Sequence, residues 1–495
     1  MKPRVPAFLI LAALVVAILP LGLGCAPDEP ETVKTGTIPA DTFDPKVWGD
    51  VYPVQYDLWL ATAEDRPAGE SPYKRGGDEG KVVYDKLSEY PFMALLFNGW
   101  GFGVEYNEPR GHAHMLTDQI EIDPSRVKTG GACLTCKTPY ATAMREEQGA
   151  SYMADPYLEV LSRIPEEHRE LGVACIDCHD NETMALKLSR PALTTALESI
   201  GFDHEGATRQ QMRTLACAQC HVTYVLQRDE EMKPVELIYP WQGSSEGAIT
   251  IENIIDVIKD EPSYYEWKQG VTGFKLAFIR HPEYEFFTAG SVHANAGLSC
   301  ADCHMPYTRV GSAKVSDHNV TSPLKNELEA CRQCHPSSIE DLKDQVVQIQ
   351  ERTLSMTNRA GYATAVSAKL FETTHKAQES GEKIDQALYD QAKELYLQAF
   401  YRTNYLGAEN SLGFHNPSEA GRIAGDAVAM ATQCQALLRQ ALAEAGVSVP
   451  ADINLELGTY LNNRGEKGLM FDSEVELKDP TGVQDLLTPA ESLGY

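Results

Sequence analysis

Cys133-Leu134-Thr135-Cys136-Lys137 is one of five CxxC motifs in this chain, and it is the one in which lysine follows the second cysteine. Histidine follows in the other four, which are Cys175–His179, Cys217–His221, Cys300–His304 and Cys331–His335. In a CxxCH motif both thiols form thioethers with haem vinyl groups, and the adjoining imidazole binds the iron. The sequence therefore predicts five covalently bound haems c, one of which has an amine as its ligand.

The ten motif cysteines are the predicted haem attachment points: Cys133, Cys136, Cys175, Cys178, Cys217, Cys220, Cys300, Cys303, Cys331 and Cys334. Random placement of the chain's cysteines would give roughly 0.3 CxxC pairs, so chance does not explain five. Paired CxxC motifs can also make four-thiolate zinc sites, but such sites do not call for a histidine after four of the five pairs. Of the two remaining cysteines, Cys434 falls on an apolar helical stripe and is predicted to be a buried core thiol.

The first residues predict an export signal. Met1 to Arg4 is a short basic start, and Ala7 to Leu23 is an apolar run that ends in small residues before Cys25. A membrane span would need ~20 apolar residues with anchoring flanks, so we expect residues 1–24 to be a signal segment. The protein is then periplasmic, and Cys25 is either a lipidated first residue or discarded with the signal.

The chain is strongly acidic, with 43 Lys and Arg against 71 Asp and Glu and a formal net charge of −28. This charge argues against nucleic acid and against an anionic membrane surface as partners. An anionic substrate would also be repelled at long range, so its site would require a local cationic funnel.

The pattern along the chain predicts a mainly α protein, with a multihaem cytochrome c core, little β structure and long C-terminal helices. Residues 25 to about 110 read as irregular, apart from an apolar patch at Met93 to Phe97. After Pro336 apolar residues recur at helical spacing, with Ser338 and Asp341 as a helix-start signature. Further helices are predicted at about 384–406 and 417–445, the latter opening at Pro417 and stopping at Gly446. We therefore divide the chain into a five-haem catalytic region at 25–336, a long-helix region at 337–450 that packs on it as a single compact unit, and a tail at 451–495.

The ligands of the haems can be counted. An electron-transfer haem with one histidine usually has a second, because a full coordination shell limits rearrangement of the iron. Of 13 histidines, four are motif ligands, which leaves nine for four distal positions. The motif of Lys137 provides no sixth ligand, so an open iron face at that haem is the expected substrate site.

One CxxCK motif followed by four CxxCH motifs, ahead of a helical C-terminal third, resembles the pentahaem cytochrome c nitrite reductases that form ammonium. The resemblance covers residues from about 45 to 445. It implies four distal ligands: His112, in Arg110-Gly111-His112, for the third haem; His293, in Ser291-Val292-His293, for the fifth; His318, after Asp317, for the second; and His415, in Phe414-His415-Asn416-Pro417, for the fourth. His114, His168, His204 and His375 are then surface or core histidines.

The resemblance also implies the active-site residues. His281, in His281-Pro282-Glu283-Tyr284-Glu285, resembles the family's active-site histidine, and Tyr224, three residues after His221, resembles its tyrosine. The family's arginine lies shortly upstream of CxxCK, and Arg126 is the preferred match because a planar guanidinium can hold nitrite oxygens in a fixed geometry. Lys128 competes with it, since the spacing to the following glycine differs.

Two positions depart from the family pattern. Many members bind calcium through a Glu before the tyrosine and a Gln before the histidine, where this chain has Thr223 and Arg280. A hydroxyl and a permanent cation do not provide the oxygen ligands that calcium needs. We therefore expect no calcium at the active site, and Arg280 in its place, orienting the loop and keeping the pocket cationic.

The implied activity is the six-electron reduction of nitrite to ammonium, with Lys137 tuning the iron. Two other functions remain open: a multihaem conduit for electrons, and a related reductase that acts on sulfite, hydroxylamine or tetrathionate. The resemblance further implies a membrane-bound quinol-oxidising cytochrome c as the electron donor and a homodimer formed through the C-terminal helices, although helix patterning alone suits a monomer equally well.

Overall fold

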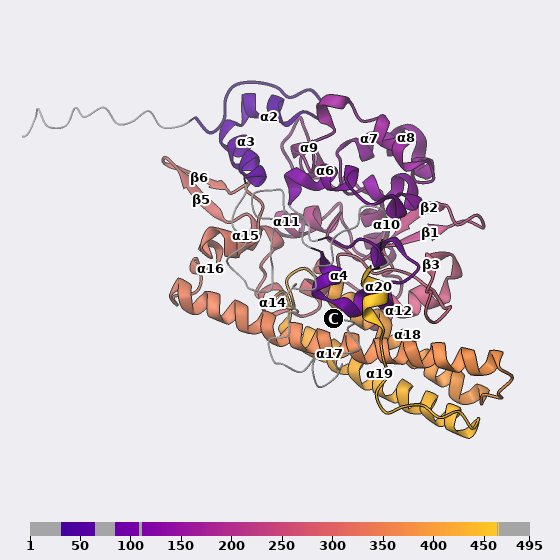
Figure 1. Cartoon of the computed structure of the whole chain (residues 1–495). Coiled ribbons are helices and arrows are strands. Elements are labelled where there is room, and N and C mark those ends of the chain that lie inside the picture. Colours follow the sequence, from indigo (N-terminus) through magenta and orange to yellow (C-terminus); the bar gives the residue numbers. More distant parts are fainter. Residues whose placement is uncertain (1–30, 65–84, 108–110, 463, 465–495) are drawn as a thin grey trace, which may run out of the picture.

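The computed structural model describes residues 31–64, 85–107, 111–462 and 464, and helices dominate it (Figure 1). The helices that precede the long C-terminal ones are α2 (Pro45–Val51), α3 (Pro53–Leu60), α4 (Lys86–Glu89), α5 (Pro91–Leu96), α6 (Met115–Ile120), α7 (Tyr140–Gln148), α8 (Tyr157–Ser162), α9 (Cys175–Cys178), α10 (Pro191–Ser199), α11 (Arg209–Ala218), α12 (Ile251–Asp260), α13 (Glu283–Thr288), α14 (Val292–Asn295), α15 (Cys300–His304) and α16 (Glu329–Arg332). They have ten residues or fewer, so their packing rather than their length stabilises them. The predicted mainly α fold class is confirmed.

Three long helices follow the fifth motif: α17 (Ile339–Glu379), α18 (Gln386–Ala408) and α19 (Pro417–Glu444). The predicted starts are confirmed. Oγ of Ser338 accepts a hydrogen bond from the backbone N of Asp341 at 3.1 Å, and Pro417 is the first residue of α19, where a missing N–H costs nothing. The second helix begins and ends two residues later than predicted.

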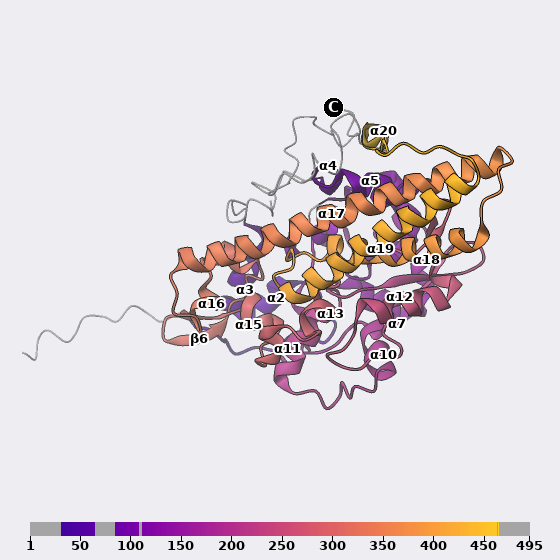
Figure 2. The same cartoon turned by 90° about the horizontal axis from the view of Figure 1, so that it is seen from below.

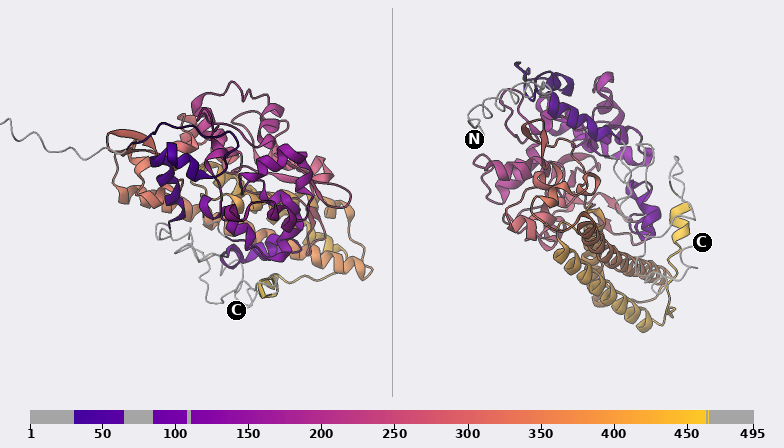
Figure 3. Two further views of the ribbon diagram at one scale, coloured as in Figure 1. Left: turned by 90° about the horizontal axis from the view of Figure 1, so that it is seen from above. Right: turned by 90° about the vertical axis from the view of Figure 1, so that its left-hand side faces the viewer.

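The long helices lie side by side along one face of the molecule, and the short helices pack above them in Figure 1. Figure 2 shows this face directly, and the right view of Figure 3 shows the long helices below the short ones. Helix α5 packs on α17, where the rings of Phe92 and Tyr362 meet edge to face at 5.3 Å. Gly361 is needed at this contact, because a Cβ there would lie 2.3 Å from the Phe92 ring. The hydrophobic core is continuous across both parts.

Cys434 lies in that core. Its side chain is fully buried on α19, and burial raises the pKa of the thiol to about 12. The predicted core thiol is therefore confirmed.

The expectation of an irregular segment before residue 110 was wrong in part. Helices α2 to α5 occupy much of the described portion of it, and the apolar patch from Met93 to Phe97 is buried. Pro45, Pro53 and Pro91 each begin one of these helices. Proline suits the first turn of a helix, so the proline content that suggested irregular structure in fact marks helix starts.

Strands form three two-stranded antiparallel hairpins among the described residues: β1 (Val225–Arg228) with β2 (Pro234–Ile238), β3 (Trp267–Lys268) with β4 (Lys275–Leu276), and β5 (Tyr307–Val310) with β6 (Ala313–Ser316). β1 begins four residues after His221, and its pairing with β2 fixes the direction in which the chain leaves the third motif. A last short helix, α20 (Leu457–Asn462), packs against α5. Within the described ranges, none of the helices combines the length and the apolar character that crossing a bilayer requires. The predicted signal and Cys25 lie outside the described residues.

Candidate functional site

The lysine motif turns more tightly than the histidine motifs. In three of the histidine motifs the backbone N of the histidine donates to the carbonyl of the first cysteine, four residues back: His179, His221 and His335, at 2.8–3.0 Å. The backbone N of Lys137 instead donates to Leu134, three residues back, at 3.0 Å. The segment that leads into it, Pro124–Leu134, is also of the tighter 3-10 kind. Lys137 thus leaves its motif along a different path from that of the histidines.

Each motif histidine faces a second histidine from a distant part of the chain. The distances between ring centroids are 6.2 Å for His179 and His318, 6.0 Å for His221 and His112, 6.1 Å for His304 and His415, and 6.3 Å for His335 and His293. These are the four pairs that the resemblance implied. His112 lies at the start of the turn before α6, and Arg110 beside it lies outside the described residues.

This spacing suits an iron between the two rings. Metal–imidazole bonds of about 2.0–2.1 Å on both sides, with the half-width of each ring added, place the centroids roughly 6.3 Å apart. Two imidazoles that simply packed on each other would have no reason to keep that separation four times. The residues therefore fit four haems with two histidine ligands each.

Contacts at Nδ1 fix the rings of four of these histidines and leave their Nε2 atoms available to a metal. The Nδ1 atoms of His179, His304 and His318 lie 2.8–3.0 Å from backbone carbonyl oxygens. His415 differs, because its Nδ1 lies 2.7 Å from Oε1 of the buried Glu409. Such outer partners fix the ring and raise the basicity of the ligand.

The motif of Lys137 lies beside groups from two other segments, one that carries His221 and Tyr224 and one that carries His281. Burial lowers the pKa of His281 to about 3, and the nearby Lys137 contributes only in its protonated form, so this imidazole is neutral near pH 7. Its ring lies edge-on to His221, with 6.4 Å between the centroids. Burial raises the pKa of Tyr224 above its ordinary value, so the phenol keeps its proton. His281 has a positive φ of 48°, a strained conformation of the kind found at functional sites.

Arg280 is buried, pairs with an acidic side chain and lies beside Tyr224. Its guanidinium donates two hydrogen bonds to Glu266, at 2.8 and 2.6 Å, and one to the carbonyl of Phe278 at 2.8 Å. It also lies over the ring of Tyr224 at 4.9 Å. Arg280 therefore fixes the face of the phenol and the residue that precedes His281. The sequence reasoning missed Glu266, which lies far from every motif along the chain.

Arg126 packs against an aromatic ring, whereas Lys128 lies exposed to solvent. The Arg126 guanidinium stacks on the ring of Phe102 at 4.3 Å, with Nη1 4.0 Å from Oε2 of the buried Glu105. The same Phe102 ring carries Arg280 on another side, at 5.7 Å, so the two arginines are neighbours. Lys128 is exposed.

The side chains at positions 223 and 280 do not suit a calcium ion. Thr223 contributes only a hydroxyl, and Arg280 brings a permanent cation. The carboxylate of Glu266 is occupied by both guanidinium N–H groups. Calcium binds six to eight oxygen ligands, so this donor set disfavours it.

Three of the histidines without an assigned role have ordinary side-chain partners. His168 bonds to Tyr140, His204 lies 3.2 Å from Glu198, and His375 bonds to Tyr389 at 2.8 Å. His114 is the residue that precedes α6.

Known proteins share this architecture. The profile of the cytochrome c552 family matches residues 44–488. A cytochrome c-552 of Maridesulfovibrio salexigens is 33% identical over 417 residues, which cover 81% of this chain and 77% of that protein. The cytochrome c nitrite reductase subunit NrfA of Nitratidesulfovibrio vulgaris is 32% identical over 437 residues, which cover 83% of this chain and 82% of that protein.

Among solved structures, the cytochrome c nitrite reductase of Desulfovibrio desulfuricans has a similar fold, with a TM-score of 0.74 and 26% identity. The match covers 87% of this chain and 95% of that one, whose catalytic subunit is described with two calcium sites. Sequence and fold therefore agree over most of the length. The chain belongs to the cytochrome c552 family of multihaem cytochromes c.

Proposed function

We propose that this protein is an ammonia-forming cytochrome c nitrite reductase. It converts nitrite, six electrons and eight protons to ammonium and two water molecules. The relatives and the solved structure named nitrite reductases support the substrate. The observation that carries the proposal is the placement of His281 and Tyr224, from two other segments, beside the one motif that ends in lysine.

When bound, the haems would relay electrons from the donor and would provide the iron at which nitrogen is held. Lys137 ligates one haem, and the four histidine pairs ligate the others, which gives five. The spacing of the four pairs supports this count.

The side chains around Lys137 bind nitrite and deliver protons. Arg126 attracts the anion and holds an oxygen through its fork of N–H donors. His281, as a neutral imidazole, donates a hydrogen bond to a nitrite oxygen and assists N–O cleavage. Tyr224 keeps its proton at neutral pH and can pass it to a departing oxygen, with His281 as its partner.

Arg280 takes the place that calcium has in other members. Its pair with Glu266 orients the chain before His281, and its stacking on Tyr224 holds the phenol. Metal analysis of the purified enzyme tests this assignment. One calcium per chain that is essential for activity would contradict it.

The remaining assignments follow from the family. The protein is periplasmic, with Cys25 as a candidate lipid anchor, and it receives electrons from a membrane-bound quinol-oxidising cytochrome c. It forms a homodimer through the long helices. Residues 25–336 form the catalytic region, and residues 337–450 pack on it as one unit.

The test is the ammonium yield from nitrite with reduced methyl viologen, taken alongside the spin state of the resting haems. We expect a high-spin haem and six electrons consumed per ammonium formed. A conduit for electrons would instead have every iron six-coordinate and low-spin, with no ammonium. Yields from sulfite, hydroxylamine and tetrathionate in the same assay identify a related reductase.

Lys137→His tests the role of the amine. We expect impaired nitrite reduction in protein that carries its full complement of covalent haems. Unchanged turnover with a normally loaded haem would remove Lys137 from the mechanism.

A further inference from the structure

Arg190 is a buried arginine outside the candidate catalytic groups, at the residue that precedes α10. All five of its side-chain N–H groups find acceptors, which satisfies the guanidinium completely. Nε donates to the carbonyl of Thr135 at 2.8 Å, Nη1 to the hydroxyls of Thr142 and of Ser189, and Nη2 to the carbonyl of Thr138 at 3.2 Å and to Oδ1 of Asp177 at 2.6 Å.

Two of these acceptors flank Lys137, the predicted iron ligand of the lysine motif. The carbonyls of Thr135 and Thr138 lie on either side of Cys136 and Lys137 along the chain. A single rigid guanidinium therefore holds the backbone before and after Lys137. The turn that it holds is the tight one, in which the backbone N of Lys137 donates to Leu134.

Arg190 also joins this turn to the second and third motifs. Asp177 is the residue before the second cysteine of the second motif, and Gln219 has the same place in the third. Oε1 of Gln219 accepts from the backbone N of Arg190 at 3.0 Å. The other oxygen of Asp177 accepts from the backbone N of Ala174 at 2.9 Å and so caps its own motif. Three consecutive haem motifs thus meet at one arginine.

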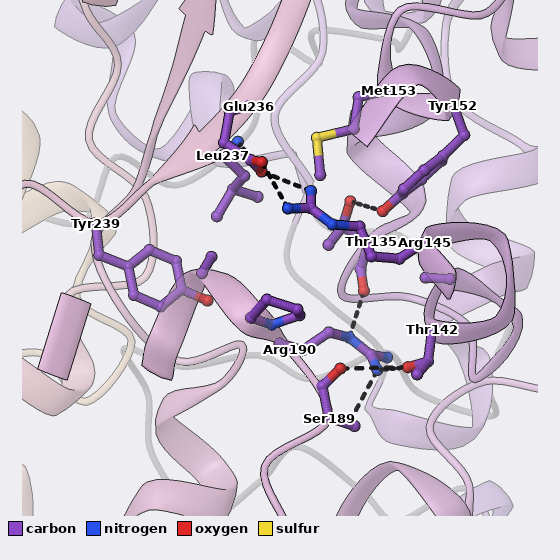
Figure 4. A pocket seen from close by; sticks show the side chains of 13 residues that line it. Thr135, Thr142, Arg145, Tyr152, Met153, Ser189, Arg190, Glu236, Leu237 and Tyr239 are labelled. Atoms are coloured by element: carbon purple, nitrogen blue, oxygen red, sulfur yellow. Dashed lines mark hydrogen bonds and ion pairs between the residues drawn. The ribbon is translucent and has the colours of Figure 1, made fainter. Parts of the chain in front are cut away.

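A pocket beside Arg190 suggests a different role for this residue, as part of an anion-binding site. The carboxylates that pair with the two arginines of the pocket argue against this role. Figure 4 shows Arg190 and Arg145 on the lining of this pocket. Arg145 forms a two-pronged pair with Glu236, at 2.8 and 2.7 Å, and Arg190 is paired with Asp177. Both cations are thus neutralised by carboxylates, and the contacts of Arg190 serve the protein itself.

We propose that Arg190 is a positioning residue for the haem that Lys137 ligates. It fixes the turn on both sides of Lys137 and holds that turn against the second and third motifs. This inference rests on the proposed function, because it assumes that the Lys137 amine binds iron.

A lysine ligand needs such support more than a histidine does. The ammonium or amine group sits on a flexible four-carbon stem, whereas an imidazole is rigid and is oriented further by the bond at its Nδ1. Fixing the backbone at both ends of the residue is the remaining way to direct the amine. The planar fork of arginine suits this task, because it reaches several acceptors in a fixed geometry.

The experiment compares Arg190→Gln and Arg190→Lys with the control Arg145→Gln in the full-length holoenzyme. Arg145 borders the same pocket, and both of its Nη atoms donate to the carboxylate of Glu236. Haem content, the resting high-spin signal, and kcat and KM for nitrite are measured. In Arg190→Gln we expect an altered high-spin signal and a kcat lower by about 100-fold, because a shift of about 1 Å in a reacting group can cost that much. KM should stay unchanged, since Arg190 does not touch nitrite.

The kcat and the high-spin signal of Arg190→Lys should fall between those of Arg190→Gln and wild type. Those of Arg145→Gln should match wild type. Fully loaded Arg190→Gln with the wild-type signal and kcat would overturn the inference. If Arg190→Gln does not load its haems, Arg190→Lys decides: a wild-type signal and kcat would overturn the inference, and an altered signal would support it. A wild-type enzyme with only low-spin haems and no ammonium is a different result, because it rejects the proposed function itself.

Discussion

Oε1 of Glu409 lies 2.7 Å from Nδ1 of His415, and both residues lie in the connection between α18 and α19, where Glu409 caps the end of α18. Three further donors fix the carboxylate: the backbone N and Oγ of Ser411 and the backbone N of Gly413, at 2.8–3.0 Å. His179, His304 and His318 have carbonyl oxygens at the same place. In the proposed ligation, a charge would thus distinguish the haem of His304 and His415 from that of His179 and His318.

Glu409→Gln should make that haem easier to reduce. A carboxylate behind an imidazole stabilises the ferric iron, so its loss shifts the midpoint potential upwards, by roughly 60 mV if the effect is tenfold. Spectroelectrochemistry of the five haems measures the shift. Glu419→Gln on α19, whose carboxylate pairs with Arg422, is the control and should leave all potentials in place.

Arg280→Gln should destabilise the protein strongly. It leaves the buried Glu266 without its two-pronged partner, and breaking a buried pair costs about 3–5 kcal/mol in the free energy of unfolding. Thermal unfolding, with and without added calcium, is the measurement. Arg422→Gln removes exposed pairs and should cost less than about 1 kcal/mol. Full recovery of Arg280→Gln by calcium would mean that an ion can occupy the place of the guanidinium after all.

Arg126→Gln should lower kcat/KM for nitrite by about 10²–10³, the usual effect of removing one donor from a preorganised site. Lys128→Gln, at the exposed neighbouring position, should be close to wild type. Steady-state kinetics with nitrite at low and high salt separates a local contact from long-range attraction, since salt screens only the latter. A large loss in Lys128→Gln with none in Arg126→Gln would reverse the assignment.

Glu285→Gln should change how stability depends on pH. Oε1 of Glu285 accepts hydrogen bonds from the backbone N of Thr223 and from Trp241, but its buried Oε2 finds no partner, and burial raises the pKa of this carboxyl to about 8. The folded protein therefore holds a proton that the unfolded chain releases above its ordinary pKa. Stability should fall as the pH rises from about 4.5 to about 8, by about 1.4 kcal/mol per pH unit.

Glutamine resembles the protonated acid, so the variant should lack this slope and be more stable than wild type at pH 8. Unfolding midpoints from pH 4.5 to 8 provide the comparison, with Glu246→Gln at an exposed position as the control. Parallel curves for wild type and Glu285→Gln would show that the carboxyl titrates normally.

Local patterns predicted the parts of this protein that depend on neighbours in sequence. The caps at Ser338 and Pro417 placed the starts of α17 and α19, and the apolar stripe around Cys434 predicted the buried face of α19, but the end of α17 at Glu379 was not predicted. The short helices before residue 110 were not predicted, because helices of eight residues or fewer depend on packing that a local pattern does not contain.

Long-range partners could not be read in the same way. Glu266, Glu409 and Arg190 carry no motif of their own. Arg190 contacts Thr135 far away along the chain, and Glu266 and Glu409 contact Arg280 and His415 across the loops that separate them. The distal histidines were matched only by resemblance, since spacing alone offers nine candidates for four positions. Burial of an arginine with all its donors satisfied is a property of the folded chain.

The tight turn at Lys137 bears on protein design. A lysine cannot simply be exchanged for the motif histidine of another cytochrome, because the neighbouring peptide would still follow the wider turn and aim the amine elsewhere. A transplant of this ligand would have to carry the 135–138 segment together with an arginine that reaches it from outside.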